Sequence, residues 1–205
     1  MTDASERRKR QTPFPLSPSW LDDIRQAVEV MNRGGVILYP TDTIWGIGCD
    51  AVNAEAVRRV YEIKRRADSK ALITLVDSVA KVQFYVREFP DLAWDLIEMA
   101  DKPLTIIYDG ARNLASNLPA ADGSVAIRVT QEPFSQTLCQ RMKRAIVSTS
   151  ANVSGEPSPR CFDDIPDEIK KAVDYICTSR REEKHNPPAS GILKLRANGE
   201  VKVIR

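Results

Sequence analysis

The stretch "AIVSTSANVSG", Ala145–Gly155, joins a short apolar run to a dense cluster of polar side chains. The run at 145–147 predicts a buried strand. The eight residues that follow, 148–155, combine hydroxyls, an amide and a glycine, which is more than a surface turn requires. Hydroxyl, amide and backbone donors placed together are suited to phosphate or carboxylate oxygens. The stretch therefore predicts a strand that ends in an anion-binding loop.

Helical patterns alternate with extended ones on both sides of this strand. Apolar residues recur at helical spacing over 20–31, with Ser17 or Ser19 as the N-cap. Asn53 is expected to cap a second helix, in which apolar residues again share one face. Further helices are expected at 79–86, 91–100, 134–143 and 163–172.

The extended patterns predict the strands of a single sheet. They are "GVILYP" (35–40), "ALITLV" (71–76), "LTIIY" (104–108), "VAIRV" (125–129), "AIVS" (145–148), "DYICT" (174–178) and the hairpin-like pair "GILKLR" and "EVKVI" around "ANG" (191–204). About seven strands and six helices in alternation predict a layered α/β domain, or α+β in some schemes.

Length and composition favour one globular domain. The chain has 205 residues, of which 42% are hydrophobic, enough for a substantial core. We expect a domain at 20–205, preceded by a flexible, basic and proline-rich arm at 1–19. The basic run 7–10 could contact RNA, although a solvated tail is the simpler interpretation. A net charge of +2 argues against indiscriminate polyanion binding.

Cysteine usage and hydropathy predict neither a metal centre nor a membrane span. Cys49, Cys139, Cys161 and Cys177 form no C-x-x-C pair, and His185 is the one histidine of the sequence. No apolar run approaches the roughly 20 residues that cross a bilayer. The expected location is therefore a reducing cytoplasm.

The segment "YPTDTIWGIG", 39–48, follows the first predicted strand. Thr41, Asp42 and Thr43 place short polar side chains where ligands bind in layered α/β domains. Taken alone, however, Thr-Asp-Thr is more typical of a capped turn. Both interpretations stay open at this point.

Two nucleotide-binding motifs are not supported. Gly46, Gly48 and Ala51 match G-x-G-x-x-A, but that motif needs a strand, a glycine turn and a helix in direct succession, and "PTDTIW" intervenes. The sequence also contains no G-x-x-x-x-G-K. A dinucleotide fold and a P-loop nucleotidase are both disfavoured.

A cationic cluster, "EIKRRADSK" at 62–70, ends the second helix. The helix dipole explains one or two cations at this end, but not Lys64, Arg65, Arg66 and Lys70 together. Arginine forks and lysine ammonium groups bind phosphate oxygens. The cluster predicts a triphosphate site.

An arginine on one face of a sheet is predicted within "SVAIRV", 124–129. Side-chain alternation directs Ser124, Ala126 and Arg128 to one face of the strand and the apolar residues to the other. An arginine on a sheet face needs an anionic partner. An internal carboxylate and a substrate carboxylate are equally consistent with the sequence.

Four of these stretches, in this order and at these separations, resemble the YrdC-like family of threonylcarbamoyl-AMP synthases. They are "GGVILYPTDTIWGIGCDA", "EIKRRADSK", "SVAIRV" and "STSANVSGEPSP", and the resemblance extends from about residue 21 to 205. It implies a twisted, mostly parallel and partly antiparallel sheet curved around a basic cavity.

The resemblance also implies an activity. L-threonine, bicarbonate or CO2, and ATP are joined into threonylcarbamoyl-AMP, a nucleotidyl transfer that releases pyrophosphate. A partner enzyme then transfers the threonylcarbamoyl group to tRNA. Mg2+ is expected to accompany ATP, because it favours phosphate oxygens. The alternative is a divergent paralogue that binds double-stranded RNA or ribosomes without synthase activity.

The resemblance assigns residues to two substrates. Those expected to bind threonine are Thr43, Arg128, Ser148 and Ser190. Those expected to bind ATP are Lys64, Arg66, Lys70, Ser124, Ser150, Asn152, Ser158 and Arg205. Lys64 and Arg66 would position phosphates, and no side chain is assigned as a nucleophile.

The sequence departs from the family pattern at "DKPLT", 101–105, where Lys102 replaces a glycine. Lys102 could add a phosphate contact or obstruct the pocket. Ala67 and Ala71 replace prolines, and Gly191 replaces a threonine.

Overall fold

One mixed sheet organises the protein, as the computed structural model shows for residues 16–65, 72–184 and 190–205, the part of the chain that it describes. The strand order is β7-β1-β2-β6-β3-β5-β4-β8-β9. The strands are β1 (Ile37–Tyr39), β2 (Gly46–Asp50), β3 (Ile73–Val76), β4 (Leu104–Tyr108), β5 (Val125–Val129), β6 (Ile146–Ser150), β7 (Tyr175–Ile176), β8 (Gly191–Leu195) and β9 (Val201–Val203). The predicted single mixed sheet is confirmed.

The sheet differs from expectation in strand number and direction. In the described part of the chain it has nine strands instead of about seven. Both strands of the predicted C-terminal hairpin are present, and the strand that was not predicted is β2, which lies in a stretch interpreted as a loop. The expectation of a mostly parallel sheet is wrong: five of the eight neighbouring pairs are antiparallel. The link between β1 and β2 is short, and short links join antiparallel strands.

Six helices were expected, and the described residues contain six. They are α1 (Pro18–Asn32), α2 (Ala54–Ile63), α3 (Val79–Tyr85), α4 (Leu92–Glu98), α5 (Pro133–Met142) and α6 (Asp167–Ala172). The caps of the first two are as predicted, since Ser17 accepts from the amide of Trp20 and Asn53 from that of Ala56. The helix α1 begins two residues before the expected domain boundary at 20, and α6 begins after Pro166.

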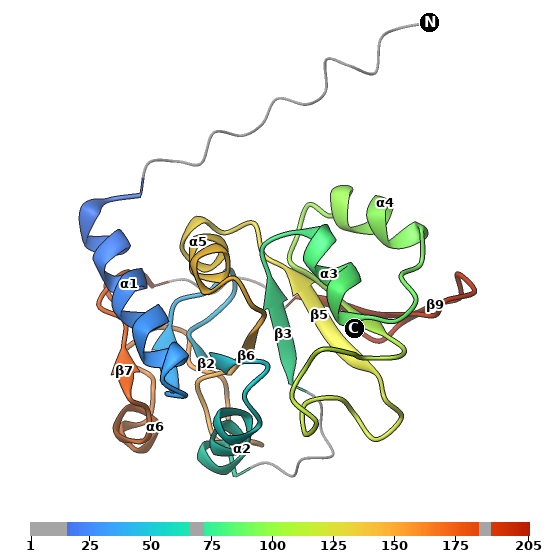
Figure 1. Ribbon diagram of the computed structural model, residues 1–205. Coiled ribbons are helices and arrows are strands. Elements are labelled where there is room, and N and C mark those ends of the chain that lie inside the picture. The colour runs from blue at the N-terminus through green and yellow to red at the C-terminus, as the bar shows by residue number, and fades with distance from the viewer. Residues whose placement is uncertain (1–15, 66–71, 185–189) are drawn as a thin grey trace, which may run out of the picture.

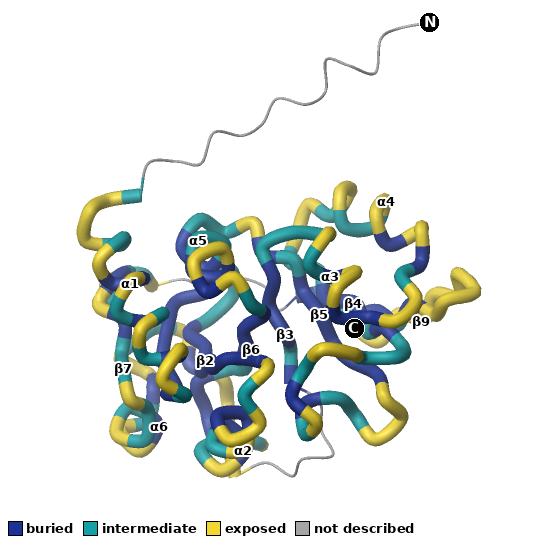
Figure 2. The backbone as a smooth tube through the Cα atoms, viewed as in Figure 1, coloured by how far each residue is buried: buried dark blue, intermediate teal, exposed yellow. Residues whose placement is uncertain are grey.

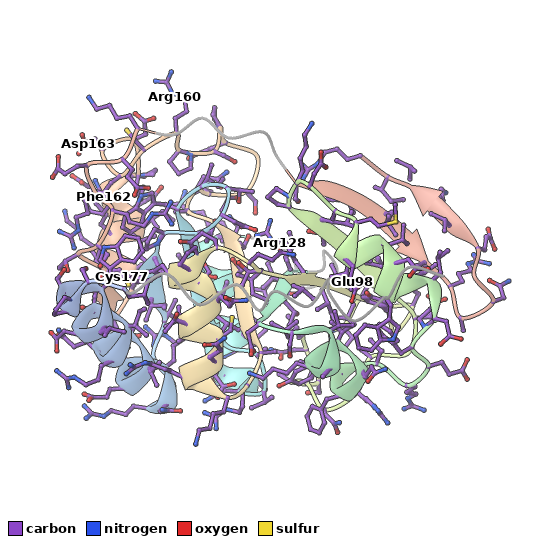
Figure 3. All side chains as sticks on the ribbon, turned by 90° about the horizontal axis from the view of Figure 1, so that it is seen from above. Glu98, Arg128, Arg160, Phe162, Asp163 and Cys177 are labelled. Carbon is purple, nitrogen blue, oxygen red and sulfur yellow. The ribbon has the colours of Figure 1, made fainter. Side chains whose placement is uncertain are left out.

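The two faces of the sheet are covered differently. Helices α1, α3 and α5 lie on the side that faces the viewer in Figure 1. Figure 3, seen from above, places the segment with Arg160 and Phe162 on the opposite side of the sheet. The central strands between these layers are buried over most of their length (Figure 2). The described residues contain no helix both long and apolar enough to span a membrane.

The strand β2, which lies between β1 and β6, has glycine at two alternate positions on one face. Gly46 pairs with Tyr39 on one side and Ser150 on the other. Gly48 pairs in the same way with Ile37 and Ser148. A Cβ atom on Gly48 would lie 2.7 Å from Cε1 of Tyr39, because the tyrosine ring crosses this position. The glycine therefore leaves space for a neighbour's side chain.

Replacing this glycine tests that packing. We expect Gly48→Ala to lower the free energy of unfolding by about 1–3 kcal/mol, since the new methyl group collides with a buried ring. Gly191→Ala is the matched control, because that strand glycine has only an ordinary 3.5 Å contact to Leu104 and should stay within about 1 kcal/mol of wild type. Urea unfolding measures both, and equal midpoints for the two variants would contradict the packing argument.

Candidate functional site

A cavity of about 580 Å³ opens on the side of the sheet away from α1, α3 and α5. Its walls come from the β1–β2 link, from strands β2, β3, β5, β6 and β8, and from the segment after β6. The lining residues are Thr41, Thr43, Ile44, Trp45, Gly46, Leu72, Ile73, Arg128, Ser148, Thr149, Ser150, Ser158, Pro159, Arg160, Ser190, Ile192 and Arg205. Hydroxyl groups and arginines predominate among the polar ones.

The strand register explains why distant segments meet here. Gly48 and Ile73 both lie opposite Ser148, and Ile73 also lies opposite Ala126. Paired residues share a face, and Arg128 follows Ala126 by two residues on that face. The cavity floor is thus one face of the sheet and extends over the four neighbouring strands β2, β6, β3 and β5.

The structure brings seven predicted site residues to this cavity wall. All four residues that the resemblance assigns to threonine line the cavity, namely Thr43, Arg128, Ser148 and Ser190. Three of the residues assigned to ATP also line it, namely Ser150, Ser158 and Arg205. Their binding roles stay predictions.

Arg128 is the buried cation of the cavity floor. Its residue is 4% exposed, and Figure 3 shows it between the segment of Arg160 and Phe162 and the C-terminal strands. Its Nη2 lies 3.2 Å from Oδ1 of Asp42. Among the described residues, neither that oxygen nor Nε of Arg128 has a hydrogen-bond partner. The internal carboxylate anticipated as one alternative is present, and the guanidinium keeps bonding capacity for a second anion.

Lys64 occupies a different place from the one expected for a phosphate-positioning group. It is 1% exposed and does not line the cavity. Its ammonium donates to the backbone oxygens of Ser150, at 2.6 Å, and Asn152, at 2.7 Å. The structure thus uses Lys64 to hold the loop that carries the cavity hydroxyls.

Two other members of the ATP set, Asn152 and Ser124, are not among the lining residues of the cavity. Asn152 is buried, and its amide donates to the carbonyls of Val153 and Glu156. Ser124 precedes β5, and its hydroxyl donates to Asp122 at 2.6 Å. That bond, together with those from the backbone amide of Ser124 and from Lys194, lowers the pKa of the Asp122 carboxyl to about 2. Both residues have local structural roles here.

Several predicted groups fall outside the described residues. They are the arm with the basic run 7–10, Arg66, Lys70, the alanines at 67 and 71, and His185. Lys102 is described and lines a separate cavity of about 160 Å³, together with Asp42 and Glu132. It therefore neither reaches nor obstructs the main cavity in this structure. The described residues hold no cluster of three metal-ligating side chains, and all four cysteines are free.

The cavity also contains residues that the sequence interpretation did not select. Trp45 and Arg160 are the most prominent of them. The ring centres of Trp45 and Phe162 lie 4.9 Å apart, and the guanidinium of Arg181 lies 4.6 Å from the centre of the Phe162 ring. These contacts anchor the segment that places Arg160 and Ser158 at the cavity. The only sequence signal for Arg160 was its position two residues after Ser158.

Comparison with known proteins agrees with this geometry. Residues 29–205 match the model of the Sua5/YciO/YrdC family, which is described as "telomere recombination". The chain belongs to the Sua5/YciO/YrdC family. The four motifs that carried the YrdC-like resemblance all lie, wholly or for the most part, in this matched region.

Two curated members of the family are named threonylcarbamoyl-AMP synthase. The Pseudomonas aeruginosa protein is 36% identical over 135 residues, which cover 65% of this chain and 72% of that relative. The Stutzerimonas stutzeri protein is 32% identical over 179 residues, covering 87% and 95%.

A solved structure of the family has the same fold. The P. abyssi Sua5 structure, complexed with L-threonine, superposes with a TM-score of 0.78 at 23% identity. The match covers 89% of this chain and 53% of that one, so the chain spans about half of that protein. At this identity the likeness concerns the fold.

The buried position of Lys64 gives a testable prediction about the loop after β6. Lys64→Met leaves two buried carbonyls without their charged donor, so we expect a loss of about 2–4 kcal/mol in the free energy of unfolding. The neighbouring Arg65 is the control, because its side chain is 68% exposed and pairs with Glu168 at the surface. Arg65→Met should change stability by less than about 1 kcal/mol. Similar unfolding midpoints in urea for the two variants would exclude a structural role for Lys64.

Proposed function

We propose that this chain is an L-threonylcarbamoyladenylate synthase. The observation that carries the proposal is a single cavity in which a buried arginine, two further arginines and several hydroxyls converge. Such a set suits a site that must hold an amino-acid carboxylate and a nucleotide together. The relatives named as synthases support the same reaction.

The reaction requires positioning more than covalent catalysis. The amine of threonine adds CO2 to give a carbamate, whose oxygen attacks the α-phosphorus of ATP. The new oxygen–phosphorus bond forms as the bond to pyrophosphate breaks, and pyrophosphate leaves with the electron pair. No protein nucleophile takes part, so the chain must chiefly align two anions and stabilise the developing charge.

Each part of the cavity then has a task. Arg128, fixed by Asp42 and burial, would bind the threonine carboxylate. Arg205 and Arg160, which also line the cavity, would bind phosphate oxygens. Arg205 is held by the backbone oxygen of Ser190, to which its Nε donates at 3.2 Å.

Mg2+ fits this site as a companion of ATP. No carboxylate is among the described lining residues, so the nucleotide phosphates and water would supply its ligands, with the cavity hydroxyls nearby. When bound, the ion would neutralise phosphate charge during the transfer. The product would pass to a partner enzyme that modifies tRNA, and the reaction would take place in the cytoplasm.

The decisive assay is pyrophosphate release by the purified chain with ATP and Mg2+. We expect release that requires both threonine and bicarbonate. Serine and valine are the control substrates, since they test recognition of the methyl and hydroxyl groups of threonine. Release at background level with all substrates present would refute the synthase assignment, and RNA binding without turnover would favour the paralogue alternative.

Arg128→Lys tests the carboxylate site while keeping the charge beside Asp42. Lysine lacks the planar fork of arginine, so we expect the KM for threonine to rise about 10- to 100-fold while the KM for ATP stays within about 3-fold. Arg25→Lys, an exposed substitution on α1, is the control and should change neither constant. An equal rise in both KM values would remove Arg128 from a threonine-specific role.

A further inference from the structure

The side chain of Tyr39 reaches the cavity wall from within the core. Tyr39 lies on β1 and is 0% exposed. Its ring crosses β2 above Gly48, and its hydroxyl donates a hydrogen bond to Oγ of Ser148 on β6, at 2.8 Å. A tyrosine two strands away is therefore bonded directly to a residue that lines the cavity.

This bond determines how the Ser148 hydroxyl is oriented, because the hydroxyl accepts a hydrogen bond from Tyr39. Burial raises the pKa of the Tyr39 phenol far above its ordinary value, so the hydroxyl stays protonated and acts as a donor. Because Oγ of Ser148 accepts this hydrogen bond, its own hydrogen is directed elsewhere. No acceptor for that hydrogen is found within the described part of the chain. The cavity side of Ser148 thus presents an O–H donor.

The position of Ser148 relative to Arg128 indicates which ligand group it meets. Ser148 and Ala126 flank Ile73 on one face of the sheet, and neighbouring strands lie about 4.8 Å apart. Arg128 is the next residue of β5 on that face, with a side chain long enough to extend toward Ser148. A carboxylate between them would accept from the guanidinium and from the serine hydroxyl.

We propose that Tyr39 is a positioning residue that holds the Ser148 hydroxyl as a hydrogen-bond donor for the carboxylate of the amino-acid substrate. The identity of that substrate as threonine rests on the proposed function. The donor role of the Ser148 hydroxyl follows from its contact with Tyr39 and is independent of that assignment. Tyr39 touches no ligand in this scheme and acts through Ser148.

Tyr39→Phe removes the hydroxyl and leaves the ring in place. We expect the KM for threonine to rise about 5- to 20-fold, with kcat and the KM for ATP changed less than 2-fold, because only the amino-acid contact loses its fixed donor. Calorimetric titration with threonine should show the same loss in affinity.

The matched control is Tyr85→Phe. Tyr85 is also buried, and its hydroxyl accepts one hydrogen bond, from the amide of Ala145 at 2.8 Å, but Ala145, unlike Ser148, is not among the lining residues of the cavity. Both variants should lose comparable stability, while only Tyr39→Phe should weaken threonine binding. Equal threonine KM values in the two variants would overturn the proposal, because a purely structural role predicts that result.

Ser148→Ala completes the test. Since Tyr39 acts through Ser148, the double variant Tyr39→Phe/Ser148→Ala should have the threonine KM of Ser148→Ala alone. Additive effects would overturn the proposed route. A wild-type chain that binds threonine without turnover would contradict the proposed function but leave this inference standing on the binding data, whereas a wild-type chain that binds no threonine would overturn both.

Discussion

The cavity depends on a strand, β2, that has glycine at two successive positions of one face, Gly46 and Gly48. A Cβ atom at Gly46 would lie 3.1 Å from Cγ2 of Thr41, and one at Gly48 would collide with the ring of Tyr39. β2 therefore has few contacts of its own on this face, and glycine is unfavourable in a strand interior. It is held instead by hydrogen-bonded neighbours on both edges, β1 and β6. The space over the two glycines lets hydroxyls of β6 line the cavity and lets the hydroxyl of Tyr39 reach that of Ser148.

Charge burial at the site has two different solutions. The ammonium of Lys64 donates to two carbonyl oxygens of the loop that it holds, so its charge stabilises the position of that loop. Arg128 is balanced by Asp42 but keeps an Nε without a hydrogen-bond partner among the described residues. A buried donor without a partner is destabilising by about 1–3 kcal/mol. Arg128 also lines the cavity, so its incomplete pairing is the departure from maximal stability that is expected at a functional site.

How far the sequence predicted the structure depends on the kind of rule applied. Helix caps were predictable because Ser17 and Asn53 act locally, and most strands because their apolar runs are typical of strands. β2 was not predicted. The ring of Tyr39 leaves no space for a side chain at Gly48, and a tertiary contact of this kind is not included in local strand propensity. The motifs also identified segments that lie at or near the cavity, but they did not predict the orientation of each side chain. Side-chain alternation assigned Ser124 to the face of Arg128, but β5 begins at residue 125, and alternation does not extend into the turn before it. The cationic cluster similarly could not reveal that Lys64 points inward.

The cations of the cavity differ in how firmly they are held, and this difference suits the two anions of the proposed reaction. Arg128 belongs to a central strand and is nearly inaccessible, so its position is set by the sheet. Arg160 lies on the segment after β6, its side chain is 75% exposed, and its partner Asp164 is on the same segment. A rigid arginine is appropriate for the carboxylate, which keeps its charge and position while the carbamate attacks. An exposed arginine is appropriate for phosphates that become a departing product, because a cation that bound pyrophosphate as firmly as Arg128 is held would slow its release. The sheet therefore holds one arginine of the cavity in a fixed position, and the segment after β6 supplies an exposed arginine that can release its anion.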